Sequence, residues 1–229
     1  MAYFGFVDTP LSFNQLQQQL RRTLPGACIE SYDLPGCATP SGDPLRLGLI
    51  NANFPTGPLA GATMRAVIRE PAYWAFCWGS GLALAQFLLA NPHWVEGRKI
   101  VDLGSGSGVA GIAAALAGAR SVIACDTDPD ARLATQINAA HNGVQLETTA
   151  HLPDACDMVL MADVLYDRQN LPLLNIAQAH AAEILVADSR VTQLPDPRYE
   201  EITRIEALTC PNLGEFDEFR VAHIFHFKA

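Results

Sequence analysis

One short segment restricts the fold of this chain more than any other: an apolar run that leads directly into three glycines at alternate positions. The run covers residues 99–103, and Gly104, Gly106 and Gly108 follow it. An alanine-rich segment with helical character, residues 108–117, comes next. Glycine allows positive φ angles and lets a ligand approach the backbone, so a strand, a glycine turn and a helix in this order indicate a βαβ unit with a ligand at the turn.

The same alternation of strand and helix extends from about residue 71 to residue 190. Expected strands cover residues 99–103, 121–125, 145–149, 158–162 and 184–187, and expected helices cover residues 76–90, 108–117, 128–142 and 168–181. This spacing predicts an α/β fold with a mostly parallel sheet. Because the apolar runs lack a two-residue alternation, helices should cover both faces. Residues 198–208 and 218–227 are expected to form a closing antiparallel pair.

Residues 1–70 have a different character, with prolines and glycines recurring from Pro25 to Gly61. One helical pattern covers residues 12–24, and the remainder is expected to form loops and short strands. We therefore expect an N-terminal extension, residues 1–70, that packs on a main domain of residues 71–229.

The composition indicates a folded protein with a sizeable core, since 49% of the 229 residues are hydrophobic and 17% are charged. A formal net charge of −9 disfavours nucleic acid or an anionic membrane as a partner, because like charges repel. The uncharged stretch 71–95 is long enough to span a bilayer. Its glycines, Gln86, Asn91 and Pro92 favour a buried segment of a soluble domain instead.

Six scattered cysteines without a Cys-x-x-Cys pair argue against a disulfide framework or a zinc site and suggest a reducing compartment. The first eight residues lack the features of a secretory signal, so we expect a cytoplasmic protein. His223 and His226 are three apart on an expected strand and should point to opposite faces, so no metal site is expected. Nothing in the sequence indicates the oligomeric state.

Two details of the glycine loop distinguish its ligand. Its spacing is GxGxG, whereas a dinucleotide fingerprint is GxGxxG. Asp102 lies two residues before the first glycine, where a carboxylate repels a pyrophosphate and attracts a cationic amino group. S-adenosylmethionine has such an amino group and carries no phosphate.

A second acid, Asp126, ends the second expected strand. A carboxylate at this position can accept hydrogen bonds from both ribose hydroxyls of an adenosyl ligand. The simpler reading is a cap for the helix that follows. Asp128, which precedes Pro129, suits the cap better, so we favour ribose binding for Asp126.

These motifs resemble motifs I and II of the seven-β-strand, Rossmann-like S-adenosylmethionine-dependent methyltransferases. The resemblance implies a seven-stranded sheet of order 3-2-1-4-5-7-6 in which strand 7 is antiparallel. It also implies S-adenosylmethionine as the cofactor and S-adenosylhomocysteine as the product. The implied cofactor-binding residues are Trp78, Asp102, Gly104, Ser105, Gly106, Ser107, Gly108, Asp126, Thr127 and Asp163.

Further motifs narrow the resemblance: Pro71-Ala-Tyr-Trp-Ala75, Trp78-Gly-x-Gly81, Asp126-x-Asp-Pro129, Asn138 and Asp163-x-x-Tyr166. Over roughly residues 70–190 they are similar to the electron transfer flavoprotein β-subunit lysine methyltransferases and their bacterial relatives. The resemblance implies that Trp78 abuts the cofactor and that Asp163 and Tyr166 are catalytic. The segment before the fourth strand departs from the family pattern. There, Thr149 or His151 is the expected neighbour of the adenine.

The chemistry expected from this resemblance is methyl transfer to a lysine amine. Tyr73, Trp74, Trp78 and Tyr166 are expected to wall a dry channel where cation–π contact holds the incoming ammonium, and Asp163 to accept a hydrogen bond from the amine. Simpler readings stay open: Trp74 and Trp78 as core residues of one helix face, Asp163 as a helix cap, and Tyr166 as a surface residue. Cys125 is expected to pack in a strand rather than act as a nucleophile.

The leading function is therefore methylation of an accessible lysine on a protein partner, with the β subunit of electron transfer flavoprotein as the first candidate. The alternative acceptor is a small amine or a heterocyclic nitrogen. A nicotinamide-dependent oxidoreductase is disfavoured by the GxGxG spacing and Asp102. A degenerate fold that serves only as a binding module is disfavoured by the intact loop with Asp126 and Asp163.

Overall fold

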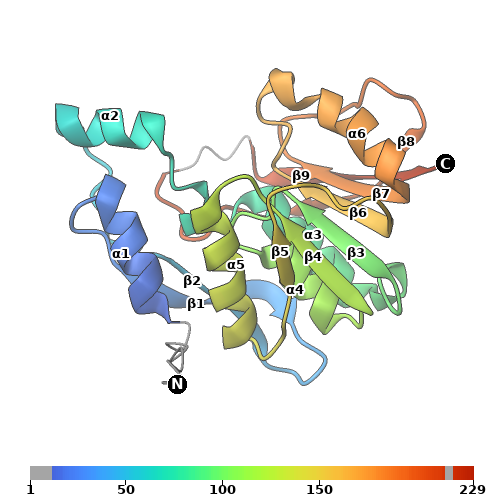
Figure 1. Cartoon of the computed structure of the whole chain (residues 1–229), viewed down its shortest axis with the longest axis horizontal. Helices are drawn as coiled ribbons and strands as arrows, with labels where there is room; N and C mark the ends of the chain where they lie inside the picture. Colours follow the sequence, from blue (N-terminus) through green and yellow to red (C-terminus); the bar gives the residue numbers. More distant parts are fainter. Residues whose placement is uncertain (1–11, 215–218) are drawn as a thin grey trace, which may run out of the picture.

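The structure, a computed structural model, describes residues 12–214 and 219–229. At its centre is a seven-stranded sheet of order β5-β4-β3-β6-β7-β9-β8 (Figure 1). The first five strands of this order are parallel, and β9 is antiparallel to both of its neighbours. The predicted α/β fold, the order 3-2-1-4-5-7-6 and the antiparallel last strand are confirmed. The strands are β3 (Lys99–Leu103), β4 (Ser121–Cys125), β5 (Glu147–Thr149), β6 (Cys156–Ala162), β7 (Ala181–Asp188), β8 (Tyr199–Glu206) and β9 (Val221–Lys228).

Helices cover both faces of this sheet, as the unalternating apolar runs predict. Figure 1 shows α6 (Pro172–His180) on one side and α4 (Val109–Leu116) on the other. In β3, Ile100 is buried in a cluster with residues of α3 (Gly79–Ala90) and α4. The next residue, Val101, belongs to the opposite cluster with Leu174 of α6. Successive buried residues of one strand therefore serve two different cores.

Two predicted helices begin later than expected. Phe76 and Trp78 are extended, and α3 starts only at Gly79. The amides of Ser80 and Gly81, in the first turn of α3, donate to the carboxylate of Asp163, which follows β6. No local pattern indicates this distant contact. In the segment predicted as one helix, 168–181, a 3-10 turn (Arg168–Asn170) precedes α6, which starts at Pro172. Proline has no amide hydrogen and suits the first turn of a helix.

The segment before the sheet contains α1 (Phe13–Thr23), as predicted, and a hairpin of β1 (Ile29–Ala38) with β2 (Pro44–Ile50). Leu47 of β2 is buried in one cluster with Leu82 of α3 and Ile112 of α4, so the hairpin shares the core of the main domain. The domain boundary at residue 70 stays a prediction, and the expectations for residues 1–8 and Glu218 lie outside the described residues.

A further helix, α2 (Gly61–Arg69), was not predicted. Its N-cap, Ala60, provides no side-chain hydrogen bond, and no residue of the helix is buried. The capping side chain that marks the start of a helix in a sequence is therefore missing here, although Met64, Val67 and Ile68 have helical spacing.

The uncharged stretch 71–95 forms the 3-10 turns Tyr73–Ala75 and Pro92–Trp94 with α3 between them. Most of α3 is buried against the sheet and the hairpin, as the preferred reading expected. Within residues 12–214 and 219–229, no helix has the length and apolar character needed to cross a membrane.

Candidate functional site

The glycine loop connects β3 to α4 in a conformation that only glycine adopts readily. Gly104, Gly106 and Gly108 have φ angles of +76°, +52° and +86°. A Cβ at Gly104 would lie 2.3 Å from Val164 Cγ1, and one at Gly108 would lie 3.0 Å from Thr135 Cα. Both the backbone angles and the close neighbours therefore require glycine at these two positions. Ser105 and Ser107 are buried, so the loop can offer a ligand mainly backbone groups.

Asp126 lies beside this loop at the end of β4. Its Oδ2 accepts a hydrogen bond from the amide of Gly106 at 2.9 Å, and its Oδ1 accepts one from the amide of Asp128 at 3.0 Å. A carboxylate has about four acceptor positions, so both oxygens keep one for a ligand. Burial raises the pKa of Asp126, opposed by these two amides.

The helix cap is a separate residue, as predicted. Asp128 is the N-cap of α5 (Pro129–His141) and accepts from the amide of Asp130 at 2.8 Å, with Pro129 in the first turn. Thr127, between the two acids, is exposed and its carbonyl accepts from Arg132 Nη1 at 3.1 Å.

Asp102 lies beneath the loop rather than on its open side. Its side chain is only 2% exposed, and its Oδ2 accepts from the amide of Gly111, in the first turn of α4, at 2.9 Å. Burial raises the pKa of this carboxyl to about 7. The expected contact of Asp102 with a cationic ligand group stays a prediction.

Asp163 follows β6 and holds the N-terminus of α3. Its Oδ2 accepts from the amides of Ser80 and Gly81 at 2.9 and 3.1 Å, and its Oδ1 accepts from the Ser80 hydroxyl at 2.6 Å. The simpler reading, a helix cap, therefore describes part of its role, although the helix lies 83 residues earlier rather than next in the chain. One acceptor position remains on Oδ1.

Two physical features set Asp163 apart from its neighbours. It is the one non-glycine residue with a positive φ angle, +54°, among residues 12–214 and 219–229. Burial raises the pKa of its carboxyl to about 6, and the Ser80 hydroxyl opposes this rise. Strained backbone and a perturbed pKa at the carboxyl end of a parallel strand are typical of functional positions.

Next to Asp163, aromatic rings from two segments meet. The Tyr73 ring centroid lies 5.6 Å from that of Tyr166 and 6.0 Å from that of Trp78, and Trp78 Nε1 donates to the Tyr73 carbonyl at 2.9 Å. Phe76, which the sequence analysis missed, lies 5.3 Å from Trp78. Both tyrosines are about half exposed, so this group of four rings, the aromatic group, faces solvent.

Trp74 does not belong to this group, and its predicted place in a channel wall is wrong. It is 2% exposed and packs with Leu16 and Leu20 of α1 and with Ala134 of α5. The 3-10 turn that contains it directs Tyr73 and Trp74 to different surroundings. The simpler reading of Trp74 as a core residue is correct, although Trp74 and Trp78 do not share a helix.

The other polar residues around the loop have partners far away in the sequence. Thr135 donates to Ser105 Oγ at 3.2 Å, and Asn138 Nδ2 donates to the Ser107 carbonyl at 2.9 Å. Asn138 Oδ1 also accepts from the amide of Gly48 in β2 at 2.7 Å, which ties the hairpin to the loop. Of these residues, only Asn138 was singled out by the sequence analysis, where it is a motif position without an assigned role.

The adenine contact predicted for Thr149 or His151 stays a prediction. The Thr149 carbonyl accepts from the amide of Asp126 at 3.0 Å, so the end of β5 lies beside the ribose candidate. The hydroxyl of Thr149 donates to the carbonyl of His151 at 3.0 Å, within an exposed turn.

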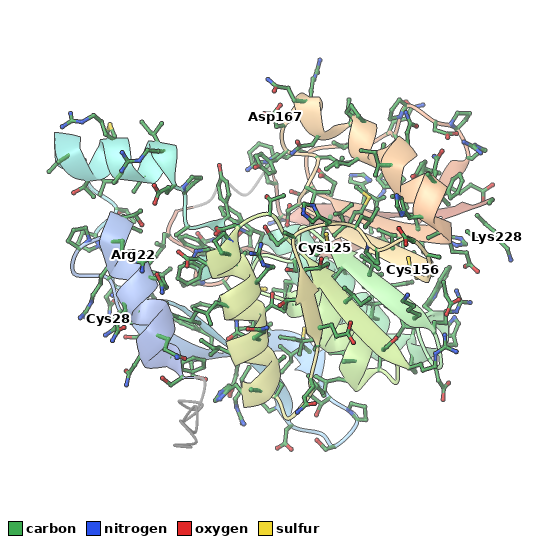
Figure 2. The ribbon with its side chains drawn as sticks, in the orientation of Figure 1. Arg22, Cys28, Cys125, Cys156, Asp167 and Lys228 are labelled. Carbon is green, nitrogen blue, oxygen red and sulfur yellow. The ribbon has the colours of Figure 1, made fainter. Side chains whose placement is uncertain are left out.

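Residues that could suggest a different chemistry have structural roles. Cys125 lies in the interior at the end of β4 (Figure 2), and burial raises the pKa of its thiol to about 11, as expected for strand packing. His223 Nδ1 lies 2.8 Å from Glu201, and His226 Nε2 lies 3.1 Å from Glu183. The described part of the chain holds no group of three or more His, Cys, Asp or Glu side chains arranged for a metal.

Comparisons with known proteins agree with this geometry. Residues 86–171 match the family model of the ribosomal protein L11 methyltransferase (PrmA). The electron transfer flavoprotein beta subunit lysine methyltransferase of Danio rerio is 36% identical over 140 residues, which cover 54% of this chain and 52% of that protein. A solved structure of a candidate RNA methyltransferase from Pyrococcus horikoshii shares the fold, with a TM-score of 0.50 at 18% sequence identity. The match covers 65% of this chain and 82% of the Pyrococcus horikoshii chain.

The chain spans about half the length of the vertebrate relatives that it matches. A longer match is found with the electron transfer flavoprotein beta subunit lysine methyltransferase homolog of Caenorhabditis elegans. That protein is 30% identical over 206 residues, which cover 75% of this chain and 84% of the relative. The chain belongs to the electron transfer flavoprotein β-subunit lysine methyltransferase family.

Proposed function

We propose that this protein is an S-adenosylmethionine-dependent methyltransferase that methylates a lysine of a protein, with the β subunit of electron transfer flavoprotein as the first candidate. The observation that carries the proposal is a direct contact between two motifs. The glycine loop at Gly104 packs against Val164, inside the Asp163-x-x-Tyr166 segment. A cofactor on the loop and an acceptor at the aromatic group would therefore be neighbours.

The residues around the loop suit an adenosyl ligand that carries no phosphate. Asp126 keeps two free acceptor positions, which matches two ribose hydroxyls. The backbone of Gly104, Ser105, Gly106, Ser107 and Gly108, together with Thr127 and Trp78, forms the remainder of the proposed cofactor site. Asp102, beneath the loop, contributes a negative potential that favours the cationic amino end of the ligand. When bound, S-adenosylmethionine supplies an electrophilic methyl group on a sulfonium.

The chain's own residues must make the lysine nucleophilic. An amine with a pKa near 10.4 costs about 4–5 kcal/mol to deprotonate at neutral pH. Burying the amine among Tyr73, Trp78 and Tyr166 lowers that cost, since desolvation disfavours the charged form. These rings also hold the incoming ammonium by cation–π contact. Asp163 accepts a hydrogen bond from the amine at the free position of Oδ1 and directs its lone pair.

The charge and the cysteines of the chain bear on its partner and its compartment. The net charge of −9 supports a basic protein patch around the lysine rather than nucleic acid or an anionic membrane as partner. The cysteine usage supports the cytoplasm as the compartment.

The test is a direct assay with two acceptors. The full chain is incubated with labelled S-adenosylmethionine and purified flavoprotein β subunit, and separately with a panel of small amines. A methyl mass shift on a lysine of the β subunit is the expected result. An unmodified β subunit beside rapid methylation of a small amine would overturn the choice of acceptor. Calorimetry that detects NAD binding without S-adenosylmethionine binding would overturn the choice of cofactor.

A further inference from the structure

The helix α2 lies at the edge of the molecule and presents an apolar face to solvent (Figure 1). Met64 and Ile68 are four residues apart, so they share one face of the helix. They are 45% and 75% exposed, and Ile68 is the most exposed large apolar side chain in the described part of the chain. Only Val67, on the inner side, packs against the cluster around α1.

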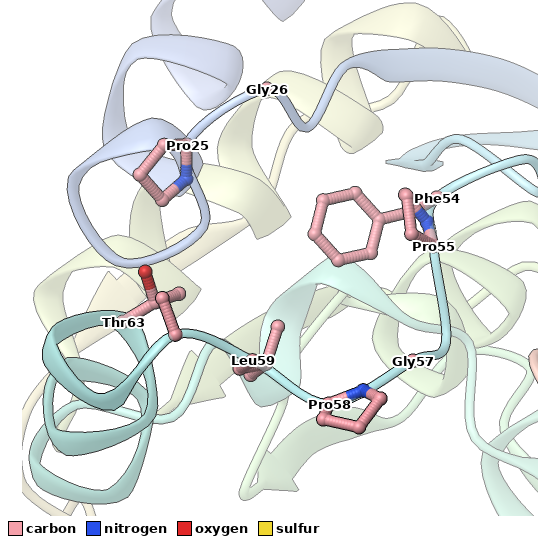
Figure 3. A pocket seen from close by; sticks show the side chains of 9 residues that line it. Pro25, Gly26, Phe54, Pro55, Gly57, Pro58, Leu59 and Thr63 are labelled. Carbon is pink, nitrogen blue, oxygen red and sulfur yellow. The ribbon is translucent and has the colours of Figure 1, made fainter.

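The apolar surface continues at both ends of α2. Before the helix is an open hollow of about 360 Å³, in which prolines and Phe54 face the first turn of α2 at Thr63 (Figure 3). After the helix, three residues lead to Tyr73, whose ring meets Tyr166 in the aromatic group. Residues 54–73, which we call the docking arm, therefore join this hollow to the aromatic group. Phe54, Leu59 and Val67 pack inward on the cluster around α1, and Met64 and Ile68 are the exposed apolar part of the arm.

The charge of this region differs from the rest of the chain. Residues 12–70 carry five arginines and four acidic residues, whereas residues 71–229 carry ten basic and nineteen acidic residues. Two of the five arginines, Arg65 and Arg69, lie on α2 and are exposed. Arg69 lies 3.3 Å from Glu70 and so already has an acidic partner, and the docking arm has a net charge of 2 − 1 = +1. The docking arm is thus an apolar border with one further positive charge, Arg65, beside an acidic site. It would complement an apolar surface that carries an acidic residue next to a lysine.

We propose that the docking arm binds the methyl-acceptor protein beside its target lysine, through an apolar ridge that carries an acidic residue. This proposal rests on the proposed function. The arm selects a folded protein because Met64, Ile68 and Arg65, spread over a helix, need a surface of matching extent. A small amine reaches the aromatic group without touching α2.

The test uses the double variant Met64→Ser/Ile68→Ser in the full chain, with Ile176→Ser as the matched control. Ile176 is also 45% exposed but lies on α6, on the other side of the sheet from α4. The double variant should raise KM for the flavoprotein β subunit at least tenfold, with kcat and cofactor affinity within a factor of two of the wild type. The control should change none of these values. Arg65→Glu should raise KM as well, by about threefold.

The outcomes separate the two proposals. A wild-type chain that methylates no protein lysine overturns the proposed function and the docking arm with it. A wild type that methylates the β subunit, with an unchanged KM in the double variant, overturns the docking arm alone. Sedimentation provides a further check: a wild-type dimer that dissociates in the double variant, at constant KM, would show that a second copy covers α2 and would overturn the proposal.

Discussion

The glycine loop and the aromatic group lie side by side, yet they are held in different ways. The loop depends on positive φ angles, buried serines, a hydrogen bond that Gly106 donates to Asp126, and hydrogen bonds that Thr135 and Asn138 donate. The aromatic group depends mostly on ring contacts, one hydrogen bond from Trp78 and two half-exposed tyrosines. The glycine loop is therefore fixed by backbone geometry and buried polar contacts, whereas the aromatic group is held more loosely at the surface.

The largest effect is expected for Gly104→Ala, because the new methyl group would meet Val164 in a backbone conformation that disfavours any side chain. Overpacking and a left-handed backbone together should cost about 2–5 kcal/mol and abolish cofactor binding. Thermal unfolding and calorimetry measure both. Gly143→Ala is the control, since Gly143 has a φ of +70° with open space around it and should show the backbone cost alone. Equal losses in the two variants would show that the contact with Val164 is unimportant.

Asp163→Ala tests whether the region around the aromatic group is held by ring packing alone. Removing the carboxylate leaves the amides of Ser80 and Gly81 without their acceptor, which should cost about 2–3 kcal/mol of stability in addition to lowering turnover. Asp163→Asn should keep more stability, since asparagine tolerates a positive φ, but it should still lower turnover. If both variants were as stable as the wild type, the link between Asp163 and α3 would be unimportant for the fold.

Asp126→Ala should weaken ligand binding, and it should also lower stability because the amides of Gly106 and Asp128 lose their acceptor. Two ribose hydroxyls lose a charged acceptor, and hydrogen bonds to charged groups contribute about 1.5–3 kcal/mol. We expect calorimetry to show weaker S-adenosylmethionine binding by roughly ten- to a hundredfold. Asp154→Ala, at an exposed bend, is the control and should bind like the wild type.

The buried acid Asp102 predicts a pH dependence of stability. Its pKa is raised from 3.8 to about 7 in the folded state, so between these values the folded state binds more protons than the unfolded state. The contribution of Asp102 to stability should therefore fall as the pH rises through this window, by at most about 1.4 kcal/mol per pH unit, and then level off. Denaturant titrations at several pH values give the free energy of unfolding at each pH. This free energy should change less steeply with pH in Asp102→Asn than in the wild type. An identical slope would contradict the raised pKa.

The smallest effect on the fold is expected for Tyr73→Ala. Its side chain is half exposed and its ring contacts are few, so stability and cofactor affinity should change by less than about 0.5 kcal/mol. KM for the protein acceptor should still rise. A large loss of cofactor affinity would show that the aromatic group and the loop form a single unit, and the contrast between them would fail.

The sequence predicted those features whose cause is local. Strand β3, the glycine turn and the Asp128 cap follow from residues next to one another, and each was confirmed. A helix cap was one reading of Asp163, but α3 could not be identified as the helix that it caps, because Asp163 and Ser80 are 83 residues apart. Trp74 was misplaced for the same reason: its neighbours come from α1 and α5. The motifs therefore predicted which residues to consider, and only tertiary contacts could divide the aromatic ones into core and surface.

The position of β9 has a consequence for how the chain is made. It lies between β7 and β8, although both of these strands leave the ribosome before it. Until Val221–Lys228 is synthesised, β7 has an open edge and β8 has no partner in the sheet. Phe225 and Phe227, which complete the core on the α6 side, are also missing at that stage. An unpaired apolar edge promotes association between nascent chains. Insertion of β9 is therefore the step that removes the open edge of β7 and protects the chain from such association.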